Sequence, residues 1–222
     1  MLTGRDGHPP RSGLDACYLA ALMARLVDLS RRTALLDRVV VYLGQHGLAD
    51  VSFRPMAKSL GVSVNALVHH FGTKDDLLAA ALRRTGQRQQ DVERRWLQRR
   101  PSMTQAELLR AWWKWTTASP ENLAIVRLGI EAVALEHSLG GVTRRQRGRQ
   151  IEHWHLGIER GLLAEGVPPN IATVEATLAT AVFTGLVVDL VASGQKARLT
   201  RALETHLAHL EQVVRDSAFA TV

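Results

Sequence analysis

Three side chains within a stretch of five residues could read the edges of nucleic-acid bases. Asn65, Ala66 and His69 lie in a short segment between Ser63 and Gly72. An asparagine can pair with adenine through two hydrogen bonds, an alanine methyl can contact the thymine methyl, and a histidine can bond to base edges or phosphate. The residue types therefore suggest a base-reading helix.

Helical periodicity places these three side chains on one face of a helix over Val64–Phe71. At about 100° per residue, Phe71 and Val64 fall within about 60° of Leu67 on one face, and the three reading residues lie opposite. Such a helix buries its apolar face and turns the other toward a major groove if it docks as a recognition helix. A surface helix with incidental polar residues would show the same pattern, so the segment does not decide the matter alone.

The preceding residues predict a partner helix and a tight turn. Ser52 can cap a short helix over Phe53–Leu60, Gly61 closes that helix, and Ser63 caps the next one. Two short helices joined by a glycine turn have the proportions of a helix-turn-helix. A longer helix, capped by Thr73, follows at once.

The positive charge of the chain is concentrated around these helices. The 222 residues carry a net charge of +7, and residues 31–100 hold 13 Lys/Arg and 6 Asp/Glu, so the two flanks are neutral. A concentrated positive field suits a polyanion, because each neutralised phosphate releases counterions. Charge alone also fits a solvated basic surface, but the charge and the helix-turn-helix together favour DNA binding.

The rest of the chain predicts helices throughout, so the expected fold class is all-α. Strand-like alternation is absent, and the breaks fall at Gly or Pro beside capping residues. Whether Ser30-Arg31-Arg32 separates two helices near the N-terminus is left open. Beyond the short helices, we expect helices at residues 14–29, at 35–46 with the apolar stripe Leu35, Leu36, Val39, Val40 and Leu43, and at 74–99, 104–118, 123–137, 142–165, 171–193 and 199–219.

The segment Leu35–Leu78 resembles the DNA-binding domain of the TetR family of bacterial regulators. The matching residues, in order, are Gln45-His46-Gly47, Ser52-Phe53-Arg54, Ala57, Leu60-Gly61-Val62-Ser63, Leu67, His69-His70-Phe71, Thr73-Lys74 and Leu77-Leu78. The resemblance implies a three-helix helix-turn-helix DNA-binding domain at residues 31–84 and a helical ligand-binding and dimerisation domain at residues 85–222. Residues 1–30 would form a partly disordered N-terminal extension.

Carried over position by position, the resemblance implies which residues contact double-stranded DNA. Arg54 would contact phosphate, and Thr73 and Lys74 would clamp a phosphate at a helix N-terminus, where the helix dipole favours an anion. Bases and backbone would be contacted by Ser63, Asn65, Ala66, His69 and His70.

Two positions depart from the family pattern. Val68 stands where the family usually has a tyrosine that contacts phosphate, and Val64 stands where a basic or polar residue is common. Both changes remove polar contacts. DNA affinity is therefore expected to rest more on Arg54, on Lys74 and on an arm formed by Arg31-Arg32.

Aromatic residues in the C-terminal half are candidates for binding an unidentified small-molecule effector. Flat aromatic walls suit a ligand pocket, although ordinary core packing would use the same residues. The pocket itself is implied by the resemblance more than by these side chains. The candidates are Trp112, Trp113, Trp115, Trp154 and Phe183.

No metal site or cofactor is expected. His153 and His155 diverge on a helix, and no carboxylate or thiol cluster accompanies His206 and His209. The resemblance also implies that the last two helices form a four-helix interface with a second copy, and the apolar run 181–190 fits a self-complementary face. Such a homodimer would place two reading helices about 34–36 Å apart on a palindromic operator.

The leading functional hypothesis is a ligand-responsive transcriptional repressor, and the alternative is a protein-interaction or sensor module with weak or lost DNA binding. Val64 and Val68 favour the alternative. An enzyme is not expected, because no catalytic triad order, phosphate-binding glycine loop or paired carboxylates are present. The sequence also predicts a cytoplasmic protein without a membrane partner. Cys17 is the single cysteine, and no secretory signal is visible. The most apolar run, at 176–188, has only 13 residues, too few to cross a membrane.

Overall fold

The computed structural model describes residues 12–49, 51–134 and 154–220, without the side chains of residues 12–17 and 220. All regular secondary structure in these residues is helical, which confirms the all-α prediction. The helices are α1 (Ser12–His46), α2 (Phe53–Leu60), α3 (Val64–Phe71), α4 (Lys74–Arg99), α5 (Gln105–Thr116), α6 (Pro120–Ala134), a helix at 154–164, α8 (Pro169–Ser193) and α9 (Lys196–Ala220). The predicted helical residues 135–137 and 142–153 lie outside the described residues.

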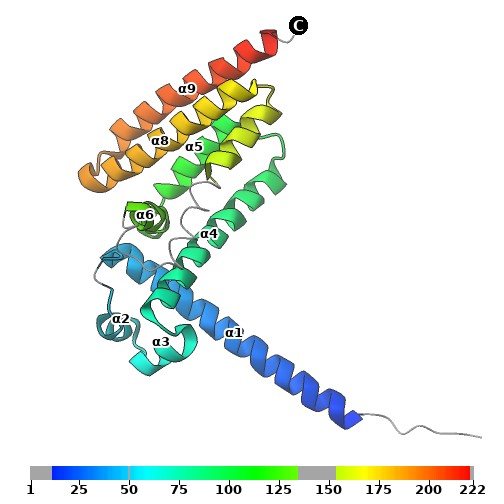
Figure 1. Ribbon diagram of the computed structural model, residues 1–222, viewed down its shortest axis with the longest axis vertical. Coiled ribbons are helices and arrows are strands. Elements are labelled where there is room, and N and C mark those ends of the chain that lie inside the picture. The colour runs from blue at the N-terminus through cyan, green and yellow to red at the C-terminus, as the bar shows by residue number, and fades with distance from the viewer. Residues whose placement is uncertain (1–11, 50, 135–153, 221–222) are drawn as a thin grey trace, which may run out of the picture.

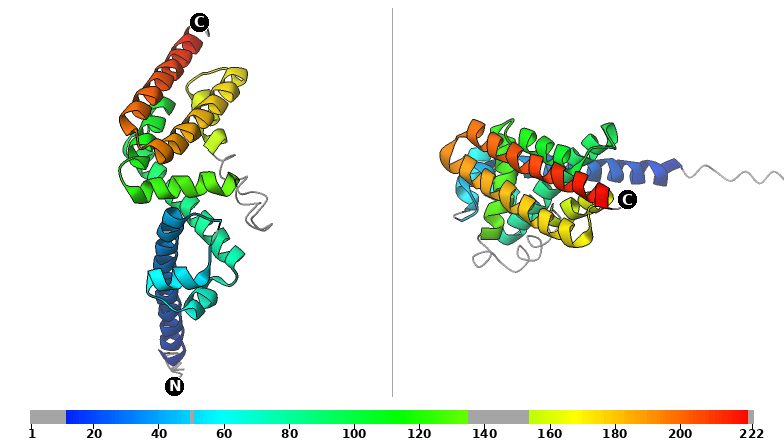
Figure 2. Two further views of the ribbon diagram at one scale, coloured as in Figure 1. Left: turned by 90° about the vertical axis from the view of Figure 1, so that its left-hand side faces the viewer. Right: turned by 90° about the horizontal axis from the view of Figure 1, so that it is seen from above.

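The molecule is elongated, with the small helices α2 and α3 at one end and the pair α8 and α9 at the other (Figure 1). α6 crosses between the two ends, and α4 runs from α3 up to the level of α5. The start of α1 and the end of α9 lie at opposite ends of the molecule (Figure 2).

α1 is one continuous helix, so Ser30-Arg31-Arg32 does not separate two helices. Its first half projects from the body (Figure 1) and leaves a row of large apolar side chains exposed. Residues 12–30 of the expected N-terminal extension are thus helical, and residues 1–11 lie outside the described residues. The exposed row consists of Tyr18, Leu19, Leu22, Met23, Leu26, Val27 and Leu29.

The second half of α1 is the centre of the first hydrophobic core. Its predicted stripe is confirmed, because Leu35, Leu36, Val39, Val40 and Leu43 are all buried. A half-buried ion pair fixes α4 against this helix, in which the guanidinium of Arg84 donates to both carboxylate oxygens of Asp37 at 2.7 and 2.9 Å. The pair raises the pKa of Arg84 above its ordinary value, chiefly through its hydrogen bond to Asp37.

α6 joins the first core to the C-terminal half. It crosses α1 so closely that a Cβ atom on Gly44 would lie 2.3 Å from the Cβ of Ala124. Beyond the end of α1, where Gly47 has a φ of 83°, the backbone N–H of Leu48 donates to the Glu131 carboxylate at 2.7 Å. The end that carries α2 and α3 and the C-terminal half are therefore packed together through α6 as well as through α4.

The second core lies among α5, the helix at 154–164, α8 and α9. α8 contains the predicted helix 171–193 and begins two residues earlier. By length and composition it could cross a membrane, although its most apolar run of 13 residues was expected to be too short for that. One face of α8 is buried in this core through Phe183 and Val187. Its opposite face leaves Val174, Leu178 and Val188 about half exposed.

Candidate nucleic-acid interface

α2 and α3 form the predicted helix-turn-helix. α2 ends at Gly61, whose φ of 63° is left-handed and suits a residue without a Cβ atom. The following N–H, of Val62, closes the turn by donating to the carbonyl of Ala57 at 3.0 Å. From α1, the guanidinium of Arg38 donates to the carbonyl of Leu60 and so satisfies a second free carbonyl at the C-terminal end of α2.

The two faces of α3 are arranged as the helical periodicity predicts. Leu67 and Phe71 are buried, and Val64 packs half-buried against the same core. On the other face Asn65 and His69 are exposed and Ala66 is half-buried. The helix thus offers solvent the side chains that could read bases, while contact with DNA stays a prediction. Val68, at 46% exposure, adds an apolar surface beside them.

Serine residues begin both helices, but only one of them caps through its side chain. Ser63 Oγ accepts from the N–H of Ala66 at 3.0 Å, as predicted. Ser52 stands at the N-cap of α2 without a side-chain hydrogen bond, so its predicted capping role is limited to its position. The Ser63 hydroxyl proton remains able to donate outward.

The start of α4 is a capping box rather than an open anion site. Thr73 accepts from the N–H of Asp76, and the Asp76 carboxylate accepts from both the hydroxyl of Thr73 at 2.7 Å and its N–H at 3.1 Å. These hydrogen bonds lower the pKa of Asp76 below its ordinary value. Both donors of Thr73 are thus engaged within the chain, and a phosphate would have to displace Asp76 to reach them. The exposed ammonium of Lys74 carries no such restriction.

The basic residues around α3 divide into free and engaged groups. Arg54 and Arg31 are exposed. Arg32 is half-buried: its Nε donates to the carbonyl of His70 at 3.0 Å, and its guanidinium lies 5.3 Å from the centre of the Phe71 ring. The arm expected at Arg31-Arg32 is therefore split, with Arg32 fixing α3 to α1 and Arg31 facing solvent.

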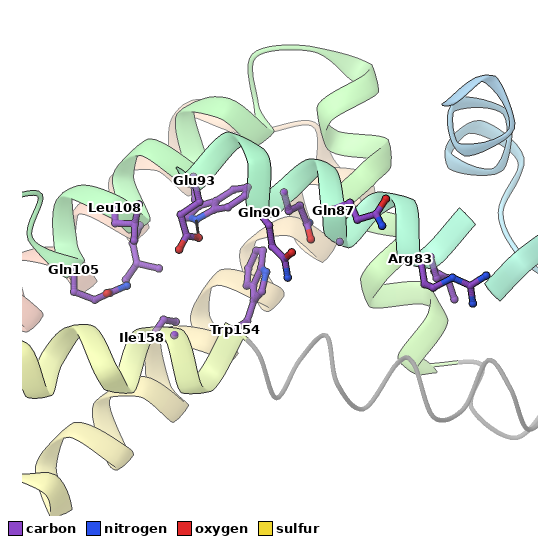
Figure 3. Close-up of a pocket in the computed structure, with 14 residues that line it drawn as sticks. Arg83, Gln87, Gln90, Glu93, Gln105, Leu108, Trp154 and Ile158 are labelled. Carbon is purple, nitrogen blue, oxygen red and sulfur yellow. Dashed lines mark hydrogen bonds between the residues drawn. The ribbon is translucent and has the colours of Figure 1, made fainter. Parts of the chain in front are cut away.

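The second candidate site, called the sensor cavity below for its proposed role, is a cavity of about 440 Å³ in the C-terminal half, bordered by α4, α5 and the helix at 154–164 (Figure 3). Of the aromatic candidates, Trp112 and Trp154 line this cavity. Phe183 lines a smaller cavity with Trp154, between α6 and α8. Trp113 and Trp115 line neither cavity.

Trp113 and Trp115 instead hold helices together. The indole N–H of Trp113 donates to the Thr200 hydroxyl on α9 at 2.9 Å, and its ring meets Phe183 edge-on at 6.0 Å. Trp115 packs half-buried between the two cores. Both residues have structural contacts that account for their position.

The polar residues of α4 that line the cavity were not predicted from the sequence. Arg83, Gln87, Gln90 and Glu93 line the cavity at intervals of three or four residues, which places them on one helix face. This spacing is visible in the sequence. The sequence does not show, however, which face of this polar helix lies toward α5 and the helix at 154–164. No group of three or more His, Cys, Asp or Glu side chains that could hold a metal occurs among the described residues.

Comparison with known proteins agrees with this arrangement. Residues 35–81 match the family model described as bacterial regulatory proteins, tetR family. No curated protein matches the chain in sequence.

Several solved structures share the fold. A TetR transcriptional regulator from Legionella pneumophila has a TM-score of 0.71 at 15% identity, covering 79% of this chain and 94% of its own. A transcriptional regulator from Rhodococcus sp. Rha1 has a TM-score of 0.65 at 24% identity, covering 82% and 95%. A regulator from Saccharomonospora viridis, solved in complex with choline, has a TM-score of 0.67 at 19% identity, covering 81% and 96%. The predicted resemblance is thereby confirmed: residues 35–81 match the tetR family of bacterial regulatory proteins, and the chain has the fold of the TetR-family structures.

Proposed function

We propose that this protein is a ligand-responsive transcriptional repressor that binds a palindromic operator as a homodimer in the cytoplasm and has no catalytic role. One observation carries the proposal: α3 is anchored by Leu67 and Phe71 and exposes Asn65 and His69, within residues 31–100, whose net charge of +7 equals that of the whole chain. A rigid helix with a free polar face in a positive field is what major-groove reading requires.

The connection between ligand and DNA is proposed to run through α4. This single helix begins with Lys74 beside α3 and lines the sensor cavity from Leu82 to Glu93. A ligand that displaces the middle of a continuous helix also displaces its end. By linkage, ligand and operator would weaken each other's binding by the same factor.

The exposed face of α8 supports the homodimer. Ile171, Val174, Leu178, Val188 and Val191 are large apolar residues that remain exposed on this helix. A two-fold interface needs one self-complementary apolar face. We therefore assign this face to a second copy, and the membrane-length character of α8 reflects a helix buried on one side by the core and on the other by its partner.

A selection experiment tests the proposed function. Full-length protein is used to select binding sites from a library of random DNA duplexes, and the enriched sites are sequenced. We expect a palindrome whose half-sites lie about one helical turn apart, with binding that weakens steeply as salt rises. Enrichment of no common sequence, with binding no tighter than to unrelated duplex, would contradict the proposal.

The alternative, an interaction module with weak DNA binding, has two observations in its favour. Val68 is exposed where a polar contact is expected, and both donors of Thr73 are occupied by Asp76. Replacing Asn65 and His69 by Ala separates the two functions. Operator affinity collapses if the protein is a repressor, whereas an interaction module loses nothing measurable.

A further inference from the structure

The sensor cavity has a polar wall and an aromatic wall (Figure 3). α4 supplies Gln87, Gln90 and Glu93, and the aromatic side chains are Trp112 of α5 and Trp154 of the helix at 154–164. The volume of about 440 Å³ falls within the range of sites that enclose small organic ligands, roughly 300–1,000 Å³. Among the described residues that line the cavity, Glu93 is the only acid.

Among the described residues of the cavity wall, none places a cation beside the carboxylate of Glu93. Its Oε2 accepts one hydrogen bond, from the indole N–H of Trp112 at 3.1 Å, and none of the ion pairs formed among the described residues includes it. Arg83 is the only basic residue among the described lining residues. It stands ten positions earlier on α4, about 15 Å away along the helix axis, and at the far end of the row of labelled side chains in Figure 3.

The aromatic wall beside Glu93 is a connected set of rings. The centre of the Trp112 ring lies 5.1 Å from that of Trp96 and 5.6 Å from that of Trp154, and Trp154 lies 5.2 Å from Phe183. The face of an indole ring carries a partial negative charge and attracts cations. A carboxylate next to indole rings therefore provides two kinds of attraction for one positive group.

We propose that the cavity binds an organic cation, an amine or quaternary ammonium compound with an apolar body, whose positive group lies against Glu93, Trp112 and Trp154. An anion would be repelled by the carboxylate. A neutral ligand would displace water from the carboxylate and leave it without a charged partner, which costs binding energy. Gln87 and Gln90 remain available to bond polar groups on the ligand body. The inference rests on the proposed ligand-responsive function.

Three compounds of similar size test the inference on the full-length protein. Benzyltrimethylammonium is the cation, neopentylbenzene is its neutral isostere, and phenylacetate is the anion. Binding is followed by titration calorimetry and by the fluorescence of the cavity tryptophans. We expect the cation to bind at least about tenfold more tightly than the neutral isostere, as a contact with a charged group would give. Equal binding of the isostere, tighter binding of phenylacetate, or no saturable binding of the cation would each overturn the inference.

Substitution of the carboxylate gives the second arm. Glu93→Gln keeps an acceptor for the Trp112 indole but removes the charge, so affinity for the cation should fall about tenfold, to the level of the neutral isostere, while affinity for the isostere stays unchanged. Asp91→Asn is the matched control, because it removes the same charge two residues away, where Asp91 pairs with Arg94 outside the cavity lining. Equal losses in the two variants, or no loss in Glu93→Gln, would refute the assignment.

The operator affinity of the ligand-free protein shows whether the ligand class or the proposed repressor function is at fault. A protein that binds its operator but not the cation refutes the ligand class and leaves the proposed repressor function intact. A protein that binds the cation as expected but no specific DNA refutes the proposed function instead.

Discussion

The crossing of α1 and α6 gives the packing between the α2–α3 end and the C-terminal half a quantitative test. In Gly44→Ala, the new Cβ would lie 2.3 Å from the Cβ and 3.2 Å from the Cα of Ala124. Since Cα is a backbone atom, no side-chain rotation relieves the overlap, and the two helices must separate. Overpacking of this kind costs about 1–3 kcal/mol, and the higher helix propensity of alanine returns about 1 kcal/mol. We expect a net loss of about 0–2 kcal/mol in the free energy of unfolding.

A double-mutant cycle isolates the overlap from propensity. Ala124→Gly removes the opposing methyl, so in the double variant the nearest atom to the Cβ at position 44 is the Cα of residue 124, at 3.2 Å, and most of the overlap is relieved. Urea unfolding followed by circular dichroism should show that the double variant is more stable than the sum of the single effects by about 1–3 kcal/mol. Additivity within about 0.5 kcal/mol would mean that the helices do not meet at this point, and would refute the packing that joins the two ends.

Three further perturbations address charge, assembly and pH. Lys74→Ala should weaken binding to every duplex alike and lower the slope of log affinity against log salt by about one, because one phosphate contact is lost. The slope is measured by fluorescence anisotropy at several salt concentrations, and an unchanged slope would exclude that contact. Leu178→Arg should convert the dimer into monomers in light scattering and reduce operator affinity, and a dimer of unchanged stability would exclude the α8 face. Burial lowers the pKa of His206 in the folded protein, so the unfolded chain binds a proton that the folded chain does not, and stability should be lost as the pH falls below about 6.5. His206→Gln should reduce the drop in Tm between pH 7.5 and 5.5, and an equal drop would assign the acid sensitivity to other groups.

Local features of the fold were predictable because their causes lie close together in sequence. The buried stripe of α1 follows from apolar residues at helical spacing, and the caps by Ser63 and Thr73 follow from a hydroxyl two or three residues before free N–H groups. The turn at Gly61 needs only a residue that tolerates positive φ. The buried and exposed faces of α3 could therefore be predicted from the sequence alone.

Contacts between distant segments could not be predicted in the same way. Arg32 donates to the carbonyl of His70, 38 residues away in the sequence. This contact removes Arg32 from the basic arm that was expected at Arg31-Arg32. The Glu131 carboxylate bonds to the backbone of Leu48 across 83 residues. Glu93 also lacked a visible role, because only the packing of α4 against α5 turns its face into a cavity wall. Such contacts depend on how helices pack, which periodicity within one helix does not specify.

The face of α3 is the centre of the account, and one comparison tests it most directly. The affinities of the wild-type protein and of an Asn65→Ala, His69→Ala double variant are measured on the selected operator and on an unrelated duplex at the same salt concentration. Because both side chains are exposed and the anchors Leu67 and Phe71 are retained, stability and dimerisation should not change. We predict that preference for the operator falls by roughly 10- to 100-fold or more, as loss of base contacts requires, while affinity for the unrelated duplex stays within about threefold. A fully retained preference would show that α3 does not read the operator and would contradict the account.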